Sequence, residues 1–229
     1  MQEHDFQRDG HSVHADVLAP ALVAPVTAAF GQLLADGAGE RAALSHPAIE
    51  ALARSHEVRR LVEPVLGAAA FAFRATLFDK CADRNWPVAW HQDRTVPVQR
   101  RIDAAGYRNW SHKGAVWFCE PPRSAHQDHL AVRVDLDGSG PDNGGLRVLP
   151  ASHRDGVLTP EQIAAAVAER SPRCPEVVAG GALRMRPLLL HSSRRSLVAG
   201  HRRVVHFEFA ARELPGGVRF AARIGAAQE

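Results

Sequence analysis

The stretch Leu130-Ala-Val-Arg-Val-Asp-Leu136 decides the fold class, because its polar residues stand at alternate positions, as they do in a β-strand. A second stretch, Phe71-Ala-Phe-Arg-Ala-Thr-Leu-Phe78, is rich in aromatic residues and is also predicted to be a strand. Further strands are expected at residues 88–90, 146–149, 183–191 and 203–210. The chain after Gly67 is therefore predicted to be mainly β.

Helical periodicity marks the N-terminal part of the chain. Apolar residues recur at helical spacing over residues 20–36, and residues 47–62 predict a second helix that ends near Pro64. One later helix is expected over residues 160–170, where Thr159-Pro-Glu-Gln162 has the pattern of a capping box. Helices followed by many short strands predict an α+β protein with a β-sandwich or small barrel core. We expect one domain, residues 1–229, with a helical part at 1–66 and a β core at 67–229.

Composition excludes several classes of protein. The 229 residues are 45% hydrophobic and 23% charged, as in ordinary globular proteins. The net charge is +3, and basic residues are interleaved with acidic ones, so neither nucleic acid nor a membrane is an expected partner. The polar N-terminus does not resemble a signal peptide, and no window is apolar enough to span a membrane. Three cysteines without a repeated spacing (Cys81, Cys119 and Cys174) predict a reducing, cytoplasmic environment.

The tripeptide His-Gln-Asp, an H-x-D pattern, occurs twice in the sequence. The first copy, His91-Gln-Asp93, follows a predicted strand, on which residues two apart share a face and can bind one cation. The second copy, His126-Gln-Asp128, follows the loop-like stretch 120–124, where nothing makes the two side chains converge. We therefore select the first copy as the candidate metal site.

The C-terminal half supplies a second histidine. Leu188-Leu-Leu-His191 places it at the end of a predicted apolar strand, and Arg202 follows eleven residues later. Two histidines and one carboxylate form the facial triad of non-haem Fe(II) oxygenases, which leaves positions open on the metal. A 2-oxo acid can chelate two of them, and an arginine binds its far carboxylate best. The alternative is that His191 is an ordinary core histidine and Arg202 belongs to a surface ion pair.

The sequence resembles the phytanoyl-CoA dioxygenase family of Fe(II)/2-oxoglutarate-dependent oxygenases over nearly its whole length. The matching stretches keep one order and spacing: Phe6–Gly10, Leu77–Lys80, Asn85–Asp93, Asp142–His153, Leu190–Ser193 and Gly200–Phe209. The resemblance implies a double-stranded β-helix (jelly-roll) core with the N-terminal helices packed outside.

The resemblance also implies a set of site residues. His91, Asp93 and His191 are the expected iron ligands, and Arg202, with Ser193 and Lys80 as helpers, is expected to bind 2-oxoglutarate. His153, the rival third ligand, corresponds to a structural turn in the family and is set aside. Arg202 and Arg203 are adjacent, and strand alternation allows only one of them to face inward.

The implied activity is hydroxylation of an unactivated C–H bond in a small-molecule metabolite or natural product. It consumes 2-oxoglutarate and O₂ and releases succinate and CO₂. Related halogenases lack the carboxylate ligand, so Asp93 favours hydroxylation, while desaturation and ring formation stay open. Two alternatives remain: a cupin-type metal dioxygenase or isomerase that does not use 2-oxoglutarate, and a non-catalytic binding module.

One segment departs from the family pattern. Residues 98–129 form a long connection without clear structure, which is typical of a lid, and we expect them to cover the site. Trp110 and Trp117 in this segment, and Arg133 on a core strand, are candidate substrate contacts; packing of the aromatic residues on the outside of the core is the alternative. Arg147 is a further candidate for the pocket lining, and a surface ion pair is the alternative for both Arg133 and Arg147.

Overall fold

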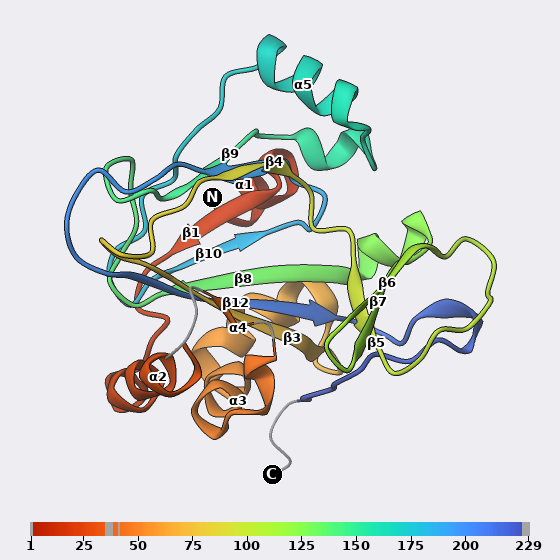
Figure 1. The fold of residues 1–229 in the computed structure, drawn as a ribbon, viewed down its shortest axis with the longest axis horizontal. Helices are drawn as coiled ribbons and strands as arrows, with labels where there is room; N and C mark the ends of the chain where they lie inside the picture. Colours follow the sequence, from red (N-terminus) through yellow and green to blue (C-terminus); the bar gives the residue numbers. More distant parts are fainter. Residues whose placement is uncertain (1, 35–38, 41, 226–229) are drawn as a thin grey trace.

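Two antiparallel β-sheets face each other across the middle of the molecule, and helices cover the outer face of the larger sheet (Figure 1). The structure is a computed structural model that describes residues 2–34, 39–40 and 42–225. The arrangement is a jelly roll with helices packed outside. The predicted α+β class with a mainly β core is therefore confirmed.

The larger sheet contains six strands in the order β1-β10-β8-β12-β3-β2. The long strand β12 pairs with β3 on one side and with β8 on the other, so the centre of the sheet comes from segments far apart in the sequence. The bounds are β1 His11–His14, β2 Gly39–Glu40, β3 Phe71–Lys80, β8 His129–Asp135, β10 Ala182–Met185 and β12 Arg202–Ala210.

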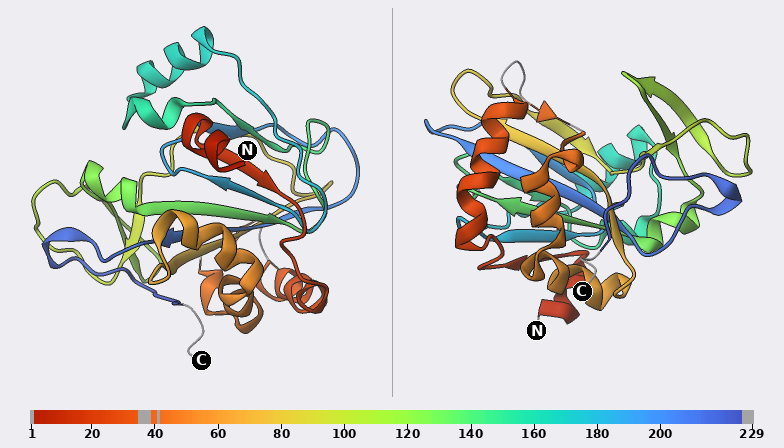
Figure 2. Two further views of the ribbon diagram at one scale, coloured as in Figure 1. Left: turned by 180° about the vertical axis from the view of Figure 1, so that it is seen from behind. Right: turned by 90° about the horizontal axis from the view of Figure 1, so that it is seen from below.

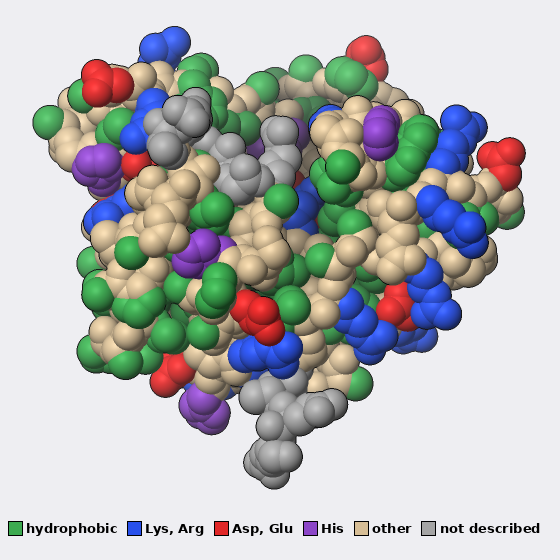
Figure 3. Space-filling view, turned by 60° about the horizontal axis from the view of Figure 1, so that its bottom comes forward, with side chains coloured by type: hydrophobic (Ala, Val, Ile, Leu, Met, Phe, Trp, Pro, Cys, Tyr) green, Lys and Arg blue, Asp and Glu red, His purple; other side chains and the backbone are tan. Residues whose placement is uncertain are grey.

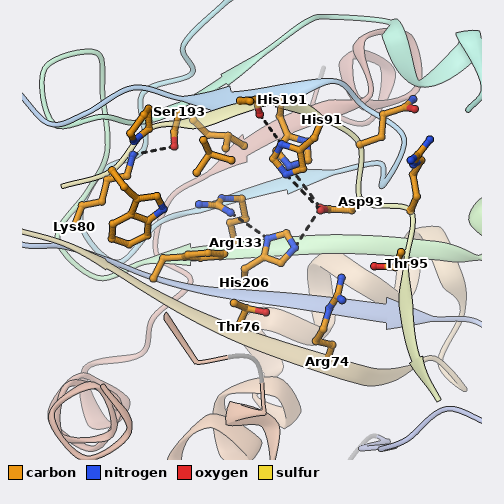
Figure 4. A pocket seen from close by; sticks show the side chains of 18 of the residues that line it. Arg74, Thr76, Lys80, His91, Asp93, Thr95, Arg133, His191, Ser193 and His206 are labelled. Atoms are coloured by element: carbon orange, nitrogen blue, oxygen red, sulfur yellow. Dashed lines mark hydrogen bonds and ion pairs between the residues drawn. The ribbon is translucent and has the colours of Figure 1, made fainter. Parts of the chain in front are cut away.

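The central strands of this sheet are buried on both faces. Leu77 and Phe207 point outward into the apolar cluster formed with the helices. Thr76, Arg133 and His206 point the other way, into a cavity between the two sheets (Figure 4). The alternate polar positions of these strands therefore line this cavity and do not lie on the outer surface of the protein.

The helices are concentrated before β3, and α2, α3 and α4 lie beneath the larger sheet in Figure 1. Their apolar faces pack on the sheet through fully buried residues such as Val26, Ile49 and Leu61. The bounds are α1 Gln2–Asp9, α2 Pro20–Leu33, α3 Pro47–Arg54, α4 His56–Leu66 and α5 Pro160–Glu169, with 3₁₀ turns η1 Ala43–Ser45, η3 Ser152–Asp155 and η4 Pro215–Gly217.

Several predicted boundaries need correction. The helix expected at 47–62 is two helices, because Ser55 adopts an extended conformation and its hydroxyl accepts a hydrogen bond from the Val58 amide. Pro64 lies inside the last turns of α4 and does not end it. The helix expected at 20–36 ends at Leu33, and positions 35 and 36 lie outside the described residues. The capping box at Thr159 and Gln162 is present as predicted.

The prediction of a single strand over residues 183–191 is also wrong. Strand β10 ends at Met185, and His191 begins a different strand, β11, in the opposite sheet. Pro187 lies between them and has no amide hydrogen to donate to a sheet, which favours a break there. The N-terminal part is not wholly helical either, since β1 and β2 form the two edges of the larger sheet.

The smaller sheet contains three strands in the order β4-β11-β9, with bounds β4 Val88–His91, β9 Leu146–Val148 and β11 His191–Ser193. A third sheet, β5-β7-β6, projects from one end of the jelly roll (Figure 2). Its bounds are β5 Val96–Val98, β6 Arg108–Lys113 and β7 Val116–Glu120, and the 3₁₀ helix η2 Arg123–Asp128 follows.

Residues 98–129 thus contain a β-hairpin at residues 108–120, followed by η2, so the expectation of a connection without regular structure was wrong for this part of the segment. Strand β6 is mostly exposed, so it lacks the apolar alternation from which a strand is predicted. The hairpin packs on a separate apolar cluster, in which the rings of Phe73 and Phe220 stack with centroids 4.5 Å apart.

The surface and the helices add two observations. Acidic and basic side chains are mixed over the face shown in Figure 3, which agrees with their interleaving in the sequence. Within the described residues, every helix is too short or too polar to cross a lipid bilayer.

We predict that proteases cut first in the turns of the 98–129 segment, and more slowly when Fe(II) and 2-oxoglutarate are bound. The segment contains glycines with positive φ at Gly106 and Gly114, and its residues Lys113 and Phe118 border the central cavity. Timed tryptic digestion with mass spectrometry measures the rates, and cleavage at Arg170, at the end of α5, is the internal control. Equal cleavage of the segment in both states, or its complete resistance, would count against a mobile cover.

Candidate metal centre and co-substrate site

A cavity of about 610 Å³ lies between the two sheets, and residues of the β6–β7 hairpin border it. Residues of both sheets line it, and most of the polar ones are drawn in Figure 4. Its lining includes six of the predicted site residues together with Arg133: His91, Asp93, His191, Ser193, Lys80 and Arg202. The structure thus brings together side chains from five different strands or strand ends.

His91, Asp93 and His191 converge at one point of the cavity. Strands β4 and β11 pair so that His191 lies opposite His91, and their ring centroids are 4.1 Å apart. The Nε2 atom of His91 lies 3.8 Å from Asp93 Oδ1, and the Nε2 atom of His191 lies 3.6 Å from Asp93 Oδ2. One ligand atom from each residue lies within 4.8 Å of the others, a spacing that a single metal ion can bridge.

Backbone carbonyls orient both imidazoles for metal binding. The Nδ1 atom of His91 lies 2.8 Å from the Ala89 carbonyl oxygen, and that of His191 lies 2.8 Å from the Leu189 oxygen. Each Nδ1–H can donate to its carbonyl, which leaves the Nε2 lone pair directed toward Asp93. Burial, reinforced by the neighbouring His91, lowers the pKa of His191 to about 3, while the Asp93 carboxylate acts in the opposite direction.

Asp93 carries the clearest sign of a missing partner. Burial raises the pKa of its carboxyl, but the imidazoles of His191, His206 and His91 outweigh burial and hold the pKa well below its usual value. Its Oδ2 atom is buried and has no hydrogen-bond partner among the described residues. A buried carboxylate oxygen without a partner is costly, and a divalent cation would satisfy it. The residues present therefore fit an iron ion.

A second group of possible ligands, Asp79, Cys81 and His201, lies near the end of β3. Here both carboxylate oxygens of Asp79 already face the His201 ring, at 2.9 and 3.1 Å. Asp79 is thus within hydrogen-bond distance of its histidine, whereas the imidazole nitrogens around Asp93 stay 3.5 to 3.8 Å from its oxygens.

Gln92, the central residue of the first H-x-D copy, fixes the chain that carries the ligands. Its amide nitrogen donates to the carbonyls of Gly156 and Leu188, at 2.7 and 2.8 Å. Its oxygen accepts from the Leu158 amide at 3.0 Å. These bonds hold Gln92 buried and leave His91 and Asp93 directed into the cavity.

His206 is a site residue that sequence reasoning missed. Its Nε2 atom lies 3.5 Å from Asp93 Oδ2, and its Nδ1 atom lies 3.2 Å from Nη1 of Arg133. An arginine can only donate, so Nδ1 accepts and the ring proton sits on Nε2, facing the carboxylate. The signal that would have found it is strand alternation, because Arg202 and His206 lie on one face of β12.

A cationic group occupies another part of the cavity. The register of β12 and β3 pairs Arg202 with Lys80, and the Lys80 ammonium donates to Ser193 Oγ at 2.9 Å. Burial, Arg202 and Arg133 lower the pKa of Lys80 to about 7, and burial and Arg133 lower the pKa of Arg202 to about 10. The Nε atom of Arg202 is buried without a hydrogen-bond partner among the described residues. These crowded positive charges fit a bound carboxylate.

Arg203 points away from this group. Its guanidinium forms a bidentate contact with Asp137, at 2.9 and 2.5 Å, on the outer side of β12. The structure therefore places Arg202 inside the cavity and Arg203 outside it, as strand alternation requires.

The other candidate residues are distributed differently. Trp110 and Trp117 do not line the cavity; they pack against the apolar cluster beneath the hairpin. Lys113 and Phe118 of the same hairpin line it instead. Arg147 points away and lies over the Trp90 ring, with its guanidinium carbon 5.2 Å from the ring centre.

The second H-x-D copy and His153 lie outside the metal centre. His126 is buried in η2, and burial lowers its pKa to about 4, while Asp128 forms an ion pair with Arg212 at 3.0 Å. His126 and His153 border a separate cavity of about 500 Å³. Neither residue belongs to the group of possible ligands around Asp93.

The sequence profile of the family described as Phytanoyl-CoA dioxygenase (PhyH) matches residues 6–204. The chain belongs to this family, and its class is that of non-haem Fe(II)/2-oxoglutarate-dependent oxygenases. The predicted family, enzyme class and cofactors are thereby confirmed.

Solved structures agree with the fold. EctD from S. alaskensis with bound Fe shares 21% identity and a TM-score of 0.71, covering 100% of this chain and 86% of that one. AviO1 from Streptomyces viridochromogenes shares 20% identity and a TM-score of 0.66, covering 93% and 95%. HygX from Streptomyces hygroscopicus, with nickel and 2-oxoglutarate bound, shares 16% identity and a TM-score of 0.63, covering 91% and 85%. No curated protein matches the sequence.

We predict that Asp93→Ala lowers the affinity for Fe(II) by more than about 100-fold, because loss of even an outer-shell partner typically costs 10–100-fold. Metal analysis after anaerobic reconstitution, together with turnover, measures the effect. Asp128→Ala is the matched control from the second H-x-D copy and should retain iron, since this carboxylate faces Arg212 on the surface. Unchanged iron content in Asp93→Ala, or its loss in Asp128→Ala, would show that the wrong copy was chosen.

Proposed function

We propose that the protein hydroxylates an unactivated C–H bond of a small-molecule metabolite or natural product. In this proposal His91, Asp93 and His191 bind iron, while Arg202, Lys80 and Ser193 bind the far carboxylate of 2-oxoglutarate. The observation that carries it is the pair of orphaned buried atoms in one cavity, Asp93 Oδ2 and Arg202 Nε. One requires a cation and the other an anion, and iron with 2-oxoglutarate supplies both.

The bound cofactor and co-substrates supply the oxidative chemistry, in which 2-oxoglutarate gives succinate and CO₂ and one oxygen atom enters the substrate. The protein's own task is to bind, orient and exclude water. The two backbone carbonyls fix the imidazoles, and His206 holds a proton toward the Asp93 carboxylate. Phe78, Trp86 and Phe118 provide apolar walls against which a substrate is oriented.

The solved relatives support small-molecule oxidation. EctD of S. alaskensis has been crystallised with 2-oxoglutarate and 5-hydroxyectoine, a hydroxylated small molecule. A carbocyclase and an epimerase from nogalamycin biosynthesis share the fold as well. The reaction outcome in such a site depends on where the substrate C–H bond lies, and we infer hydroxylation here from the complete triad of ligands.

The remaining assignments are part of the same proposal. One domain, residues 1–229, carries the activity, with residues 98–129 as a mobile cover and Arg133 as a substrate contact inside the cavity. Trp110 and Trp117 act by packing the cover and not by direct contact. The three cysteines are free thiols, which supports the cytoplasm as the location.

The alternative of a cupin-type enzyme without 2-oxoglutarate is disfavoured by a specific feature. Lys80 and Arg202 lie side by side and bury two positive charges with no carboxylate as an ion-pair partner among the described residues. In an enzyme without an anionic co-substrate, no bound anion would offset the charge of Lys80 and Arg202. A non-catalytic binding module has no use for the oriented imidazoles.

We predict that Arg202→Ala weakens the binding free energy of 2-oxoglutarate by about 2–4 kcal/mol, which is the scale of removing one partner of a buried charged pair. This energy corresponds to roughly 30- to 1,000-fold. Iron binding should survive, because no metal ligand is changed. Titration of the Fe(II)-loaded variant with 2-oxoglutarate measures the effect.

Arg203→Ala is the matched control and should bind 2-oxoglutarate normally, since Arg203 contacts Asp137 on the outer side of the sheet. If the two variants exchange phenotypes, the assignment of Arg202 is wrong by one position. If neither variant affects 2-oxoglutarate, the co-substrate proposal fails and the cupin-type alternative is preferred.

A further inference from the structure

The charges that line the central cavity do not balance. Asp93 is its only acidic residue within the described part of the chain. Six basic side chains surround the same space: Arg74, Lys80, Arg94, Lys113, Arg133 and Arg202.

Two of these cations have carboxylate partners behind the lining. Arg74 forms an ion pair with Glu208, and Arg94 lies 3.8 Å from a Glu120 oxygen. The other four, Lys80, Lys113, Arg133 and Arg202, have no ion pair with a carboxylate among the described residues.

Iron and 2-oxoglutarate do not remove this excess. The two positive charges of Fe(II) are matched by the two negative charges of 2-oxoglutarate, so together they add nothing. Asp93 then offsets one charge of the four cations that have no ion pair. Lys80 is only partly charged, because its pKa is lowered to about 7, and Arg133 also faces the charge of the buried Asp135, so a smaller excess of positive charge remains. The lining therefore remains basic, and a basic lining attracts an anion through its electrostatic field even where, as at Lys113, the cation itself is exposed to water.

The position of each cation indicates where that anion binds. Lys80 and Arg202 form the group assigned to the far carboxylate of 2-oxoglutarate. Arg133 is buried deep in the cavity, next to His206, and feels the negative charges of Asp135 and Asp93. Lys113 is the fourth of these cations. It is exposed at the end of β6, and it forms no ion pair with a carboxylate of the described residues that line the cavity.

Lys113 also has an apolar neighbour suited to substrate binding. Its ammonium nitrogen lies 5.4 Å from the centre of the Phe118 ring, and both side chains border the cavity. A ligand with an apolar body and a charged end would place the body against Phe118 and the charge on Lys113.

We propose that the substrate carries an anionic group, a carboxylate or a phosphate, and that Lys113 binds this group at the rim of the cavity. The reaction performed on this substrate rests on the proposed function above, but the anion preference is a binding property and is measured without turnover.

The test uses three probes of similar shape: 3-phenylpropionate, phenyl phosphate and neutral 3-phenylpropanamide. Each is titrated by calorimetry into protein loaded with Ni(II) and saturating 2-oxoglutarate. We expect wild type to bind at least one anionic probe ten or more times more tightly than the amide. Whichever anion is preferred distinguishes a carboxylate from a phosphate substrate.

Two variants test the role of Lys113. Lys113→Ala should reduce the preference for the anion about tenfold, and Lys113→Glu should abolish it, while the amide binds as before. Both changes lie at an exposed position and leave the core intact. Arg100→Ala, an exposed cation of the same segment that does not line the cavity, is the matched control and should keep the preference.

Equal affinity of wild type for anions and amide, or binding of none of the probes, would overturn the proposal. So would an anion preference that Lys113→Glu leaves unchanged. The visible absorption of the Fe(II) protein with 2-oxoglutarate is recorded in parallel. If that complex forms without any anion preference, the proposed function stands and the inference about Lys113 fails. If the complex does not form, the proposed function fails, and the comparison of wild type with Lys113→Glu in the metal-free protein still decides whether Lys113 binds the anion.

Discussion

The contact between the Asp93 carboxylate and the imidazoles around it is the interaction on which the rest of the structure depends. Asp93 and His91 come from the smaller sheet's β4 end, His191 from β11, and His206 from the larger sheet. Both sheets must therefore be in register for the site to exist. Hydrogen bonds of Gln92 fix the chain between His91 and Asp93, and backbone carbonyls fix the imidazole rings of His91 and His191.

Charged groups without an ion-pair partner also define the other part of the cavity, where the charge is positive. Arg202 and Lys80 are neighbours on paired strands, and their mutual repulsion is not relieved by any carboxylate ion pair within the described residues. The cavity is therefore electrostatically complementary to a cation at Asp93 and to anions at Arg202 and Lys113. We propose that these groups bind a metal, a dicarboxylate and an anionic substrate together.

Much of this could be predicted from the sequence, for a physical reason. His91, Asp93, His191 and Arg202 stand in short motifs whose spacing reflects local strand geometry, so they are visible without a structure. His206, Lys113 and Gln92 were missed because their roles depend on how distant segments meet. The break at Pro187 was missed because an apolar run of this length looks the same whether it is one strand or a strand followed by a turn. The alternation of β8 was recognised, but only the structure shows that its polar face lines a cavity.

The central claim is that one cavity binds Fe(II) and 2-oxoglutarate together. Anaerobic titration of the Fe(II)-loaded protein with 2-oxoglutarate, followed by visible absorption, tests it most directly. We expect a saturable charge-transfer band in wild type, its absence in Asp93→Ala, and a large shift of its midpoint in Arg202→Ala with no shift in Arg203→Ala. A protein that binds iron but shows no such band at any concentration of 2-oxoglutarate would contradict the account.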